Sequence, residues 1–235
     1  EDIAAPECFE IEDVLDRILD IPVMHDDQHG TAVVVLAALL NATKFSGLML
    51  GKSAIGVIGL GAAGMGISKL LLSYGVKKVI GTDLQDSAKE RLNAAGGEAG
   101  TLADVMAGAN IVVATTGCPG LIKPEMVRKG QVILALSNPN PEITPEDAVA
   151  AGAAFAADGK SVNNALGFPG IFRGALNVRA RVINNKMKIA AAKAIAACAE
   201  EGELVPSILN DEVHQKAAEA GERAALESGV IKPWE

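Results

Sequence analysis

Aromatic side chains are scarce in this sequence: Phe, Trp and Tyr make up 3% of 235 residues. The core must therefore be built from smaller aliphatic side chains. Hydrophobic residues make up 49% and charged residues 21%, a balance typical of globular rather than disordered chains. Basic residues are also in deficit, with 21 Lys and Arg against 29 Asp and Glu. A formal net charge of −8 argues against a nucleic-acid-binding surface, so no nucleic acid is expected as a partner.

Cysteine and long apolar runs are also limited. Cys8, Cys118 and Cys198 are odd in number, widely spaced and free of any CxxC pair, which fits a reducing compartment better than a disulfide framework. The longest apolar stretch, residues 32–40, is too short for a membrane span, and no basic-then-apolar leader opens the sequence. A cytoplasmic protein without a membrane partner is the expectation. The sequence opens at Glu1 rather than at Met, which suggests a piece of a longer protein.

Short apolar strands alternate with helices from Lys52 onward, which indicates βαβ units. Strands are predicted over residues 53–59, 77–83, 109–117, 130–138 and 153–159. Helices are predicted over residues 9–21, 31–43, 62–75, 87–96, 143–152, 168–180, 186–202 and 211–228. Thr31 is the expected N-cap of the second of these helices. The predicted fold class is α/β: a doubly wound, mainly parallel Rossmann-type sheet with flanking helices and a helical C-terminal segment.

A glycine-rich loop joins the first predicted strand to its helix. Gly59, Gly61 and Gly64 form GxGxxG, which permits a tight turn, backbone approach to a pyrophosphate and close helix packing. Free N–H groups at the helix N-terminus would hold the diphosphate. Asp83 ends the next strand, where a carboxylate bonds ribose hydroxyls and repels a 2′-phosphate. A plain glycine turn is the alternative, but strand, helix and Asp83 in register predict dinucleotide binding, with NAD favoured and NADP possible.

Two asparagines stand where ligands of open α/β sheets lie, beyond the carboxyl ends of strands. Asn138 ends one predicted strand and Asn164 follows the next. Neutral amides there can orient a nicotinamide carboxamide or a substrate carboxylate without adding negative charge. Turn chemistry is the alternative, since Asn-Pro and Asn-Asn are ordinary loop sequences.

Five polar residues, HDDQH at 25–29, directly precede the apolar helix. The carboxylates of Asp26 and Asp27, with those of Glu1 and Asp2, are hard oxygen ligands suited to Mg²⁺ or Mn²⁺. Histidines four residues apart would suit zinc, but the HExxH motif is absent. Acidic residues also stabilise the positive N-terminus of a helix. Spacing alone leaves metal binding and helix stabilisation open.

Five motifs, in this order, resemble the short bacterial malic enzymes: EDIAAPECFEIE, IPVMHDDQHGTA, GLGAAG, SNPNPEI and NNALGFPGIFRGAL. The resemblance covers essentially the whole sequence, and its second and fifth motifs are specific to the family. It implies oxidative decarboxylation of L-malate to pyruvate and CO₂ with reduction of NAD(P), dependent on a divalent metal. It also implies a homodimer or a larger assembly.

The resemblance implies a role for each matching residue. Glu1, Asp2 and Asp27 match the family's ligands of Mg²⁺ or Mn²⁺, and Asp26 matches an Asp that supports the catalytic base. The expected cofactor contacts are Gly59, Gly61, Ala62, Ala63, Gly64, Asp83, Thr116 and Asn138. The expected substrate contacts are Asn138 and Asn164.

The family's proton-donating Tyr and proton-accepting Lys lie upstream of the Glu-Asp pair, outside this sequence, and Tyr74 ends the glycine-loop helix. The expectation is a malic enzyme without its N-terminal region, inactive alone and partnered by that region. Residues 1–28 would be the metal-ligating end of a substrate domain. Residues 29–235 would be the NAD-binding domain, with helices from about 168 packing back. Another nicotinamide-dependent dehydrogenase without decarboxylation, or a nucleotide-sensing module, remains an alternative.

Overall fold

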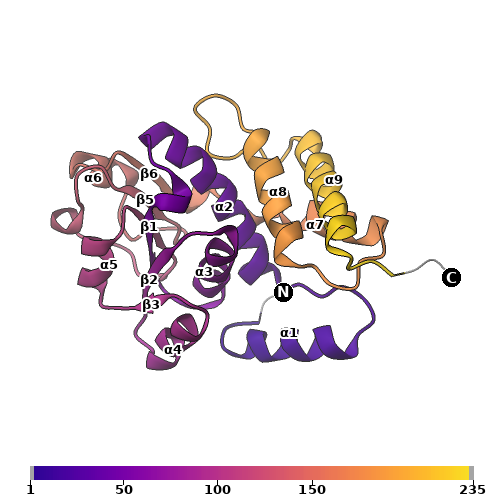
Figure 1. The fold of residues 1–235 in the computed structure, drawn as a ribbon. Coiled ribbons are helices and arrows are strands. Elements are labelled where there is room, and N and C mark those ends of the chain that lie inside the picture. Colours follow the sequence, from indigo (N-terminus) through magenta and orange to yellow (C-terminus); the bar gives the residue numbers. More distant parts are fainter. Residues whose placement is uncertain (1–2, 233–235) are drawn as a thin grey trace.

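A six-stranded sheet lies at one end of the molecule and a group of helices at the other, in a computed structural model that describes residues 3–232 (Figure 1). The strands are β1 (Ala54–Ile58), β2 (Lys78–Thr82), β3 (Glu98–Ala99), β4 (Ile111–Ala114), β5 (Val132–Ala135) and β6 (Phe155–Asp158). Their order is β3-β2-β1-β4-β5-β6, and every pairing is parallel. This is the strand order of a doubly wound Rossmann fold, so the predicted fold class is confirmed.

Helices cover both faces of the sheet. Within residues 3–232 they are α1 (Glu7–Ile18), α2 (Asp26–Ser46), α3 (Ala62–Tyr74), α4 (Asp86–Ala94), α5 (Leu102–Gly108), α6 (Pro145–Ala150), α7 (Phe168–Asn177), α8 (Asn185–Ala197) and α9 (Asp211–Ser228). Helices α2, α3 and α4 cover one face, and α5 and α6 cover the other. None of the helices in this described range combines the length and the apolar character that a bilayer crossing requires.

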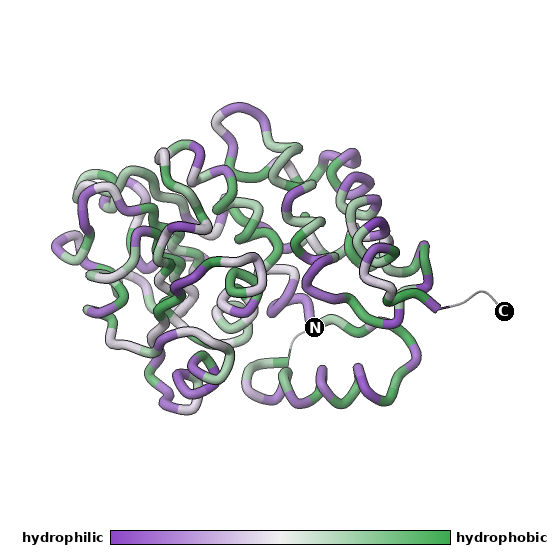
Figure 2. The backbone as a smooth tube through the Cα atoms, in the orientation of Figure 1, coloured by the Kyte–Doolittle hydropathy of each residue, from purple (hydrophilic) through white to green (hydrophobic). Residues whose placement is uncertain are grey.

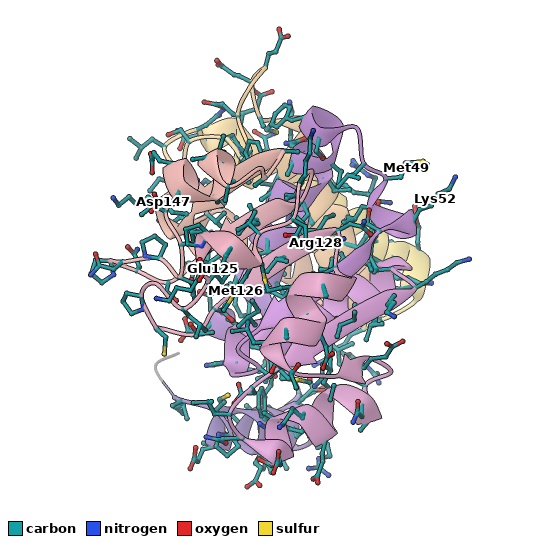
Figure 3. The ribbon with its side chains drawn as sticks, turned by 90° about the vertical axis from the view of Figure 1, so that its left-hand side faces the viewer. Met49, Lys52, Glu125, Met126, Arg128 and Asp147 are labelled. Atoms are coloured by element: carbon teal, nitrogen blue, oxygen red, sulfur yellow. The ribbon has the colours of Figure 1, made fainter. Side chains whose placement is uncertain are left out.

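Two separate apolar cores result from the alternation of side chains along the central strands. Ile55 and Val57 of β1 join the larger core, beneath α2 and α3, whereas Ile58 joins the smaller core beneath α5 and α6. Strands buried on both faces are apolar throughout, as the green segments of the sheet in Figure 2 show. Figure 3 looks onto the α5/α6 side, where Arg128 Nε donates to the Met106 carbonyl oxygen at 3.0 Å and so caps α5.

The C-terminal helices pack against α2 rather than against the sheet. Helices α8 and α9 contact each other, α8 contacts α2, and α7 contacts α9. Close approach of α7 to α9 needs glycine, because a Cβ at Gly174 would lie 2.4 Å from the Ala218 carbonyl oxygen. Helix α2 thus lies between the sheet on one side and the C-terminal helices on the other. This enclosure explains why its sequence is apolar from Ala32 to Leu39.

Several element boundaries differ from the sequence-based prediction. Helix α2 begins at Asp26 with His25 as its N-cap, so the predicted cap, Thr31, lies inside the helix. The acidic pair in its first turn makes the earlier start favourable. Strand β3 and helix α5 were not predicted; α5 begins with a capping box in which Thr101 and Asp104 bond each other's backbone N–H. Helix α2 runs across residue 28, and the domain division there stays a prediction.

One carboxylate of helix α1 makes several hydrogen bonds to the start of α2. Glu12 accepts hydrogen bonds from the His25 backbone N–H (2.8 Å), from Gln28 Nε2 (2.7 Å) and from the His29 ring (3.0 Å). Burial alone would raise the pKa of Glu12, but the His29 hydrogen bond and charge, the His25 N–H and Lys188 outweigh it and lower that pKa to about 2. The first turn of α2 and the middle of α1 are thus joined by an ionised carboxylate.

We expect this carboxylate to make the free energy of unfolding depend on pH in acid. The pKa of Glu12 is about 2 in the folded chain, against an ordinary value of 4.5, so the unfolded chain binds more protons between these values. The contribution of Glu12 to the free energy of unfolding is therefore fully present above about pH 5 and is lost as the pH drops from about 4.5 towards 2. In urea unfolding at pH 7, Glu12→Gln should lower the free energy of unfolding by about 1–3 kcal/mol, and the difference from the wild type should shrink in acid. The matched change Glu10→Gln, at an exposed position of α1, should leave the free energy of unfolding unchanged. If both variants lower it equally, this account of Glu12 is wrong.

Candidate functional site

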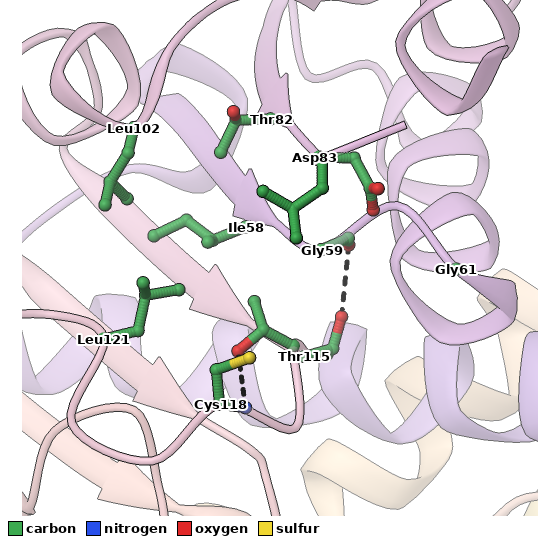
Figure 4. A pocket seen from close by; sticks show the side chains of 11 residues that line it. Ile58, Gly59, Gly61, Thr82, Asp83, Leu102, Thr115, Cys118 and Leu121 are labelled. Atoms are coloured by element: carbon green, nitrogen blue, oxygen red, sulfur yellow. Dashed lines mark hydrogen bonds between the residues drawn. The ribbon is translucent and has the colours of Figure 1, made fainter. Parts of the chain in front are cut away.

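Two adjoining cavities open at the carboxyl ends of the strands. The first, about 340 Å³, is lined by Ile58, Gly59, Gly61, Thr82, Asp83, Leu84, Leu102, Thr115, Thr116, Cys118 and Leu121 (Figure 4). The second, about 360 Å³, is lined by Thr31, Ala63, Thr115, Gly117, Leu136, Ser137, Asn138, Gly159, Val162 and Asn164. Thr115 lines both cavities. They meet next to the strand pair β1 and β4, where the strand order reverses and where open α/β sheets bind ligands.

The glycine loop lies beside the cavities, and each of its glycines is required for a different geometric reason. Gly59 has a φ of +89°, and a Cβ there would lie 2.7 Å from the Thr115 carbonyl oxygen. A Cβ at Gly64 would lie 1.8 Å from the Gly59 carbonyl oxygen, so glycine lets α3 approach the turn. A Cβ at Gly61 would meet no heavy atom within 4 Å. The open space above Gly61 therefore leaves its backbone accessible from the first cavity.

The N-terminus of α3 points its uncapped backbone groups towards this space. Gly61 is the N-cap and no side chain caps the helix, so Ala62 and Ala63 occupy the first turn with N–H groups available to a ligand. Ala63 also lines the second cavity. An uncapped helix N-terminus with a glycine in front of it suits an anion such as a diphosphate.

Asp83 lies at the end of β2 and lines the first cavity, as the sequence predicts. Its Oδ2 accepts the Leu60 backbone N–H at 2.7 Å, and its Oδ1 accepts the Gln85 N–H at 2.9 Å. Asp83 thus holds the glycine loop in place, a role that the sequence did not reveal. Each carboxylate oxygen has a second lone pair that a ribose hydroxyl can use. Figure 4 shows its carboxylate beside the turn that carries Gly59 and Gly61.

The second cavity brings together predicted residues from distant parts of the sequence. Asn138 and Asn164 both line it: Asn138 lies in the loop after β5, and Asn164 begins a short 3-10 turn that follows β6. Asn164 Nδ2 donates to Asp26 Oδ2 at 2.5 Å, which joins the cavity to the first turn of α2. Asp26 is 6% exposed, and a Cβ at Gly30 would lie 1.9 Å from its Oδ1. Gly30, which the sequence analysis left without a role, therefore makes room for the Asp26 side chain.

The predicted metal ligands are only partly within the described range. Asp27 is exposed in the first turn of α2, next to Asp26. Glu1 and Asp2 lie outside the described residues. Within residues 3–232 no group of three His, Cys, Asp or Glu side chains could hold a metal ion. A carboxylate oxygen is a ligand type that hard cations prefer, and the role of Asp27 as a metal ligand stays a prediction.

A protein-family model and several curated relatives match this chain along most of its length. The family described as "Malic enzyme, NAD binding domain" matches residues 28–105 and 87–220. The chain is 59% identical over 227 residues to "NAD-dependent malic enzyme 1" of Bacillus subtilis (strain 168), covering 96% of this chain and 52% of that protein. It is 38% identical over 271 residues to "NADP-dependent malic enzyme" of Halomonas elongata, covering 99% of this chain and 64% of that protein.

Solved structures lead to the same family. The crystal structure of malic enzyme from Pyrococcus horikoshii Ot3 matches with a TM-score of 0.89 and 39% identity, covering all of this chain (100%) and 62% of that one. The chain spans about half the length of the first curated relatives it matches, at 52% and 54%. The matched family domain binds NAD, as the glycine loop predicts. With relatives this similar along nearly its whole length, the chain belongs to the malic enzyme family.

Proposed function

We propose that the protein containing this chain converts L-malate and NAD⁺ to pyruvate, CO₂ and NADH with the help of Mg²⁺ or Mn²⁺. The observation that supports the proposal most is the pair of adjoining cavities, one at the glycine loop and one joined to α2 through the Asn164–Asp26 hydrogen bond. A dinucleotide and a small carboxylic acid need such neighbouring sites, because the reacting carbons must meet. The names of the relatives support the choice of malate.

The first cavity would hold the adenosine half of the cofactor. Ile58, Leu102 and Leu121 supply apolar walls for the adenine ring, and Asp83 would bond the ribose. The backbone N–H groups at the start of α3 would receive the diphosphate. Because a 2′-phosphate would meet the Asp83 carboxylate, we propose that NAD⁺ binds more tightly than NADP⁺. Thr116, which also lines this cavity, would contact the cofactor.

The second cavity would hold the nicotinamide and malate. Asn138 would orient the carboxamide, and Asn164 would bond a malate carboxylate while Asp26 fixes its amide group. Glu1, Asp2 and Asp27 would ligate the cation. When bound, the dinucleotide would accept the hydride from C2 of malate, and the cation would draw electron density from the C2 oxygen.

Neither cavity is lined by a tyrosine or a lysine. Tyr74 ends α3, at the helix end opposite the glycine loop. We therefore propose that the proton-accepting and proton-donating groups belong to the part of the relatives' length that this chain does not span, and that this chain alone is inactive. A homodimer or larger assembly in the cytoplasm is part of the same proposal, on the family resemblance.

The test compares this chain with the complete gene product in Mn²⁺-containing buffer. The complete protein should form pyruvate from L-malate, faster with NAD⁺ than with NADP⁺ at subsaturating concentrations, and should lose activity with EDTA. This chain should bind NAD⁺ in calorimetry without forming pyruvate. If the complete protein does not oxidise malate although the chain binds NAD⁺, the proposal is wrong and a nucleotide-sensing role or another dehydrogenase activity replaces it.

A further inference from the structure

A buried carboxylate is hydrogen-bonded to residues that line the two cavities. Glu142, in the loop that follows β5, is 0% exposed. Its Oε1 accepts the Thr116 backbone N–H (2.7 Å), Thr116 Oγ1 (2.8 Å) and Ser137 Oγ (2.5 Å). Its Oε2 accepts the Ser137 N–H at 3.3 Å. Burying a carboxylate is unfavourable unless several donors surround it, and here the donors come from the loops after β4 and β5.

These two loops form walls of the cavities. Thr116 and Cys118 line the first cavity, and Gly117, Ser137 and Asn138 line the second. The hydrogen bonds continue beyond the carboxylate: Ser137 Oγ accepts the Gly117 N–H at 2.7 Å, and Thr116 Oγ1 accepts the Cys118 N–H at 3.1 Å. Three successive N–H groups of the β4 loop are thus held directly by Glu142 or by a side chain that Glu142 holds.

We infer that Glu142 is a positioning residue for the dinucleotide, which sets the spacing of the two loops that the ligand must cross. The inference rests on the proposed dinucleotide site and concerns a residue that contacts neither cavity. The opposite wall of the first cavity, formed by Gly59 and Asp83, makes no bond to Glu142. Thr116 lines the adenosine cavity as well, but that cavity keeps its wall of Gly59 and Asp83 when Glu142 is lost. In the nicotinamide cavity, Gly117, Ser137 and Asn138 all belong to the two loops. Loss of Glu142 should therefore weaken the nicotinamide half of the site more than the adenosine half.

The test measures dissociation constants of the complete protein for NAD⁺ and for ADP-ribose, which lacks the nicotinamide. Glu142→Ala should raise the Kd for NAD⁺ about tenfold or more, because loops shifted by a fraction of an ångström no longer align with the ligand. The Kd for ADP-ribose should rise less. Glu142→Gln should stay within about threefold of the wild type, because its amide oxygen can keep the three short bonds that Oε1 accepts and only the 3.3 Å bond from the Ser137 N–H to Oε2 is lost.

A matched control separates positioning from general loss of stability. Asn41 is buried at the other end of α2, where its Nδ2 donates to the carbonyl oxygens of Ala196 (3.0 Å) and Leu204 (2.9 Å). Asn41→Ala should lower Tm, as Glu142→Ala does, and should leave both dissociation constants unchanged. If Glu142→Ala fails to fold, Glu142→Asp takes its place, since a shorter carboxylate cannot reach both loops and should raise the Kd for NAD⁺ more than that for ADP-ribose.

Three outcomes would overturn the inference. The first is a set of Glu142 variants with a lower Tm that bind NAD⁺ like the wild type. The others are an equal rise in the Kd for NAD⁺ and for ADP-ribose, and a rise in the Kd of Asn41→Ala equal to that of Glu142→Ala. A wild-type protein that does not bind NAD⁺ would overturn the proposed function itself.

Discussion

Gly64→Ala is expected to weaken dinucleotide binding strongly and to lower Tm, whereas Gly61→Ala should weaken binding and leave Tm unchanged. At Gly64 the new Cβ would lie 1.8 Å from the Gly59 carbonyl oxygen and 3.2 Å from Thr115 Oγ1. Both neighbours belong to the turn and strand end that shape the first cavity, so α3 must move away from the sheet. Overpacking of this kind costs about 1–3 kcal/mol, which corresponds to roughly 2–12 °C in Tm for a chain of this size.

A substitution at Gly61 should change ligand binding without changing the stability of the fold. Its φ of −69° is open to alanine, and a Cβ there would meet no protein atom within 4 Å. The methyl group would instead stand in the first cavity, above the N-terminus of α3, where the diphosphate is proposed to bind. We expect the Kd for NAD⁺ to rise at least about tenfold, because close backbone approach is lost.

Calorimetric titration with NAD⁺ and thermal unfolding without ligand measure the two effects. Gly51→Ala is the matched control, because Gly51 is exposed, outside the cavities, and also has nothing within 4 Å of its Cβ. It should change neither quantity. Gly61→Ala with an unchanged Kd would mean that the diphosphate does not approach α3, and the assignment of the first cavity would then be wrong.

Much of the fold was predictable because its strands are buried on both faces. Apolar runs such as residues 130–138 and 109–117 are distinct in the sequence, and the observed strands are their central parts, β5 and β4. Helix α5 was missed because it is short and follows an exposed two-residue strand, β3. Its capping box was nevertheless visible in the sequence as Thr101 followed three residues later by Asp104.

The candidate site was predictable where a general rule of sheet topology applies. Asp83, Asn138 and Asn164 follow strand ends, and parallel strands bring their carboxyl ends to one edge. The contacts that hold the site together were not predictable, because no local pattern specifies them. The Asn164–Asp26 bond joins residues 138 positions apart, and Glu142 lies in a motif whose sequence resembles a plain turn. Such contacts exist only after the whole sheet has assembled.

Asp27→Asn in the complete protein is expected to raise the Kd for Mn²⁺ by about tenfold to a hundredfold. Asp27 is exposed in the first turn of α2, beside Asp26, and is the one proposed metal ligand within residues 3–232. A hard divalent cation prefers charged carboxylate oxygens, and an amide oxygen brings no charge to the site. Mn²⁺ binding can be followed by electron paramagnetic resonance of the free ion, independently of turnover.

The same variant distinguishes metal binding from stabilisation of the α2 N-terminus. A carboxylate in the first turn of a helix contributes about 0.3–1 kcal/mol, so Asp27→Asn should lower Tm slightly even in EDTA. Asp13→Asn makes the same charge change at an exposed position of α1 and should leave the Mn²⁺ affinity unaltered. If Asp27→Asn loses stability in EDTA but binds Mn²⁺ like the wild type, the carboxylate serves the helix alone. A large rise in the Kd for Mn²⁺ with a small change in Tm would instead mean that the exposed Asp27 carboxylate, beside buried Asp26, serves mainly to bind the cation. The first turn of α2 would then hold both carboxylates in place.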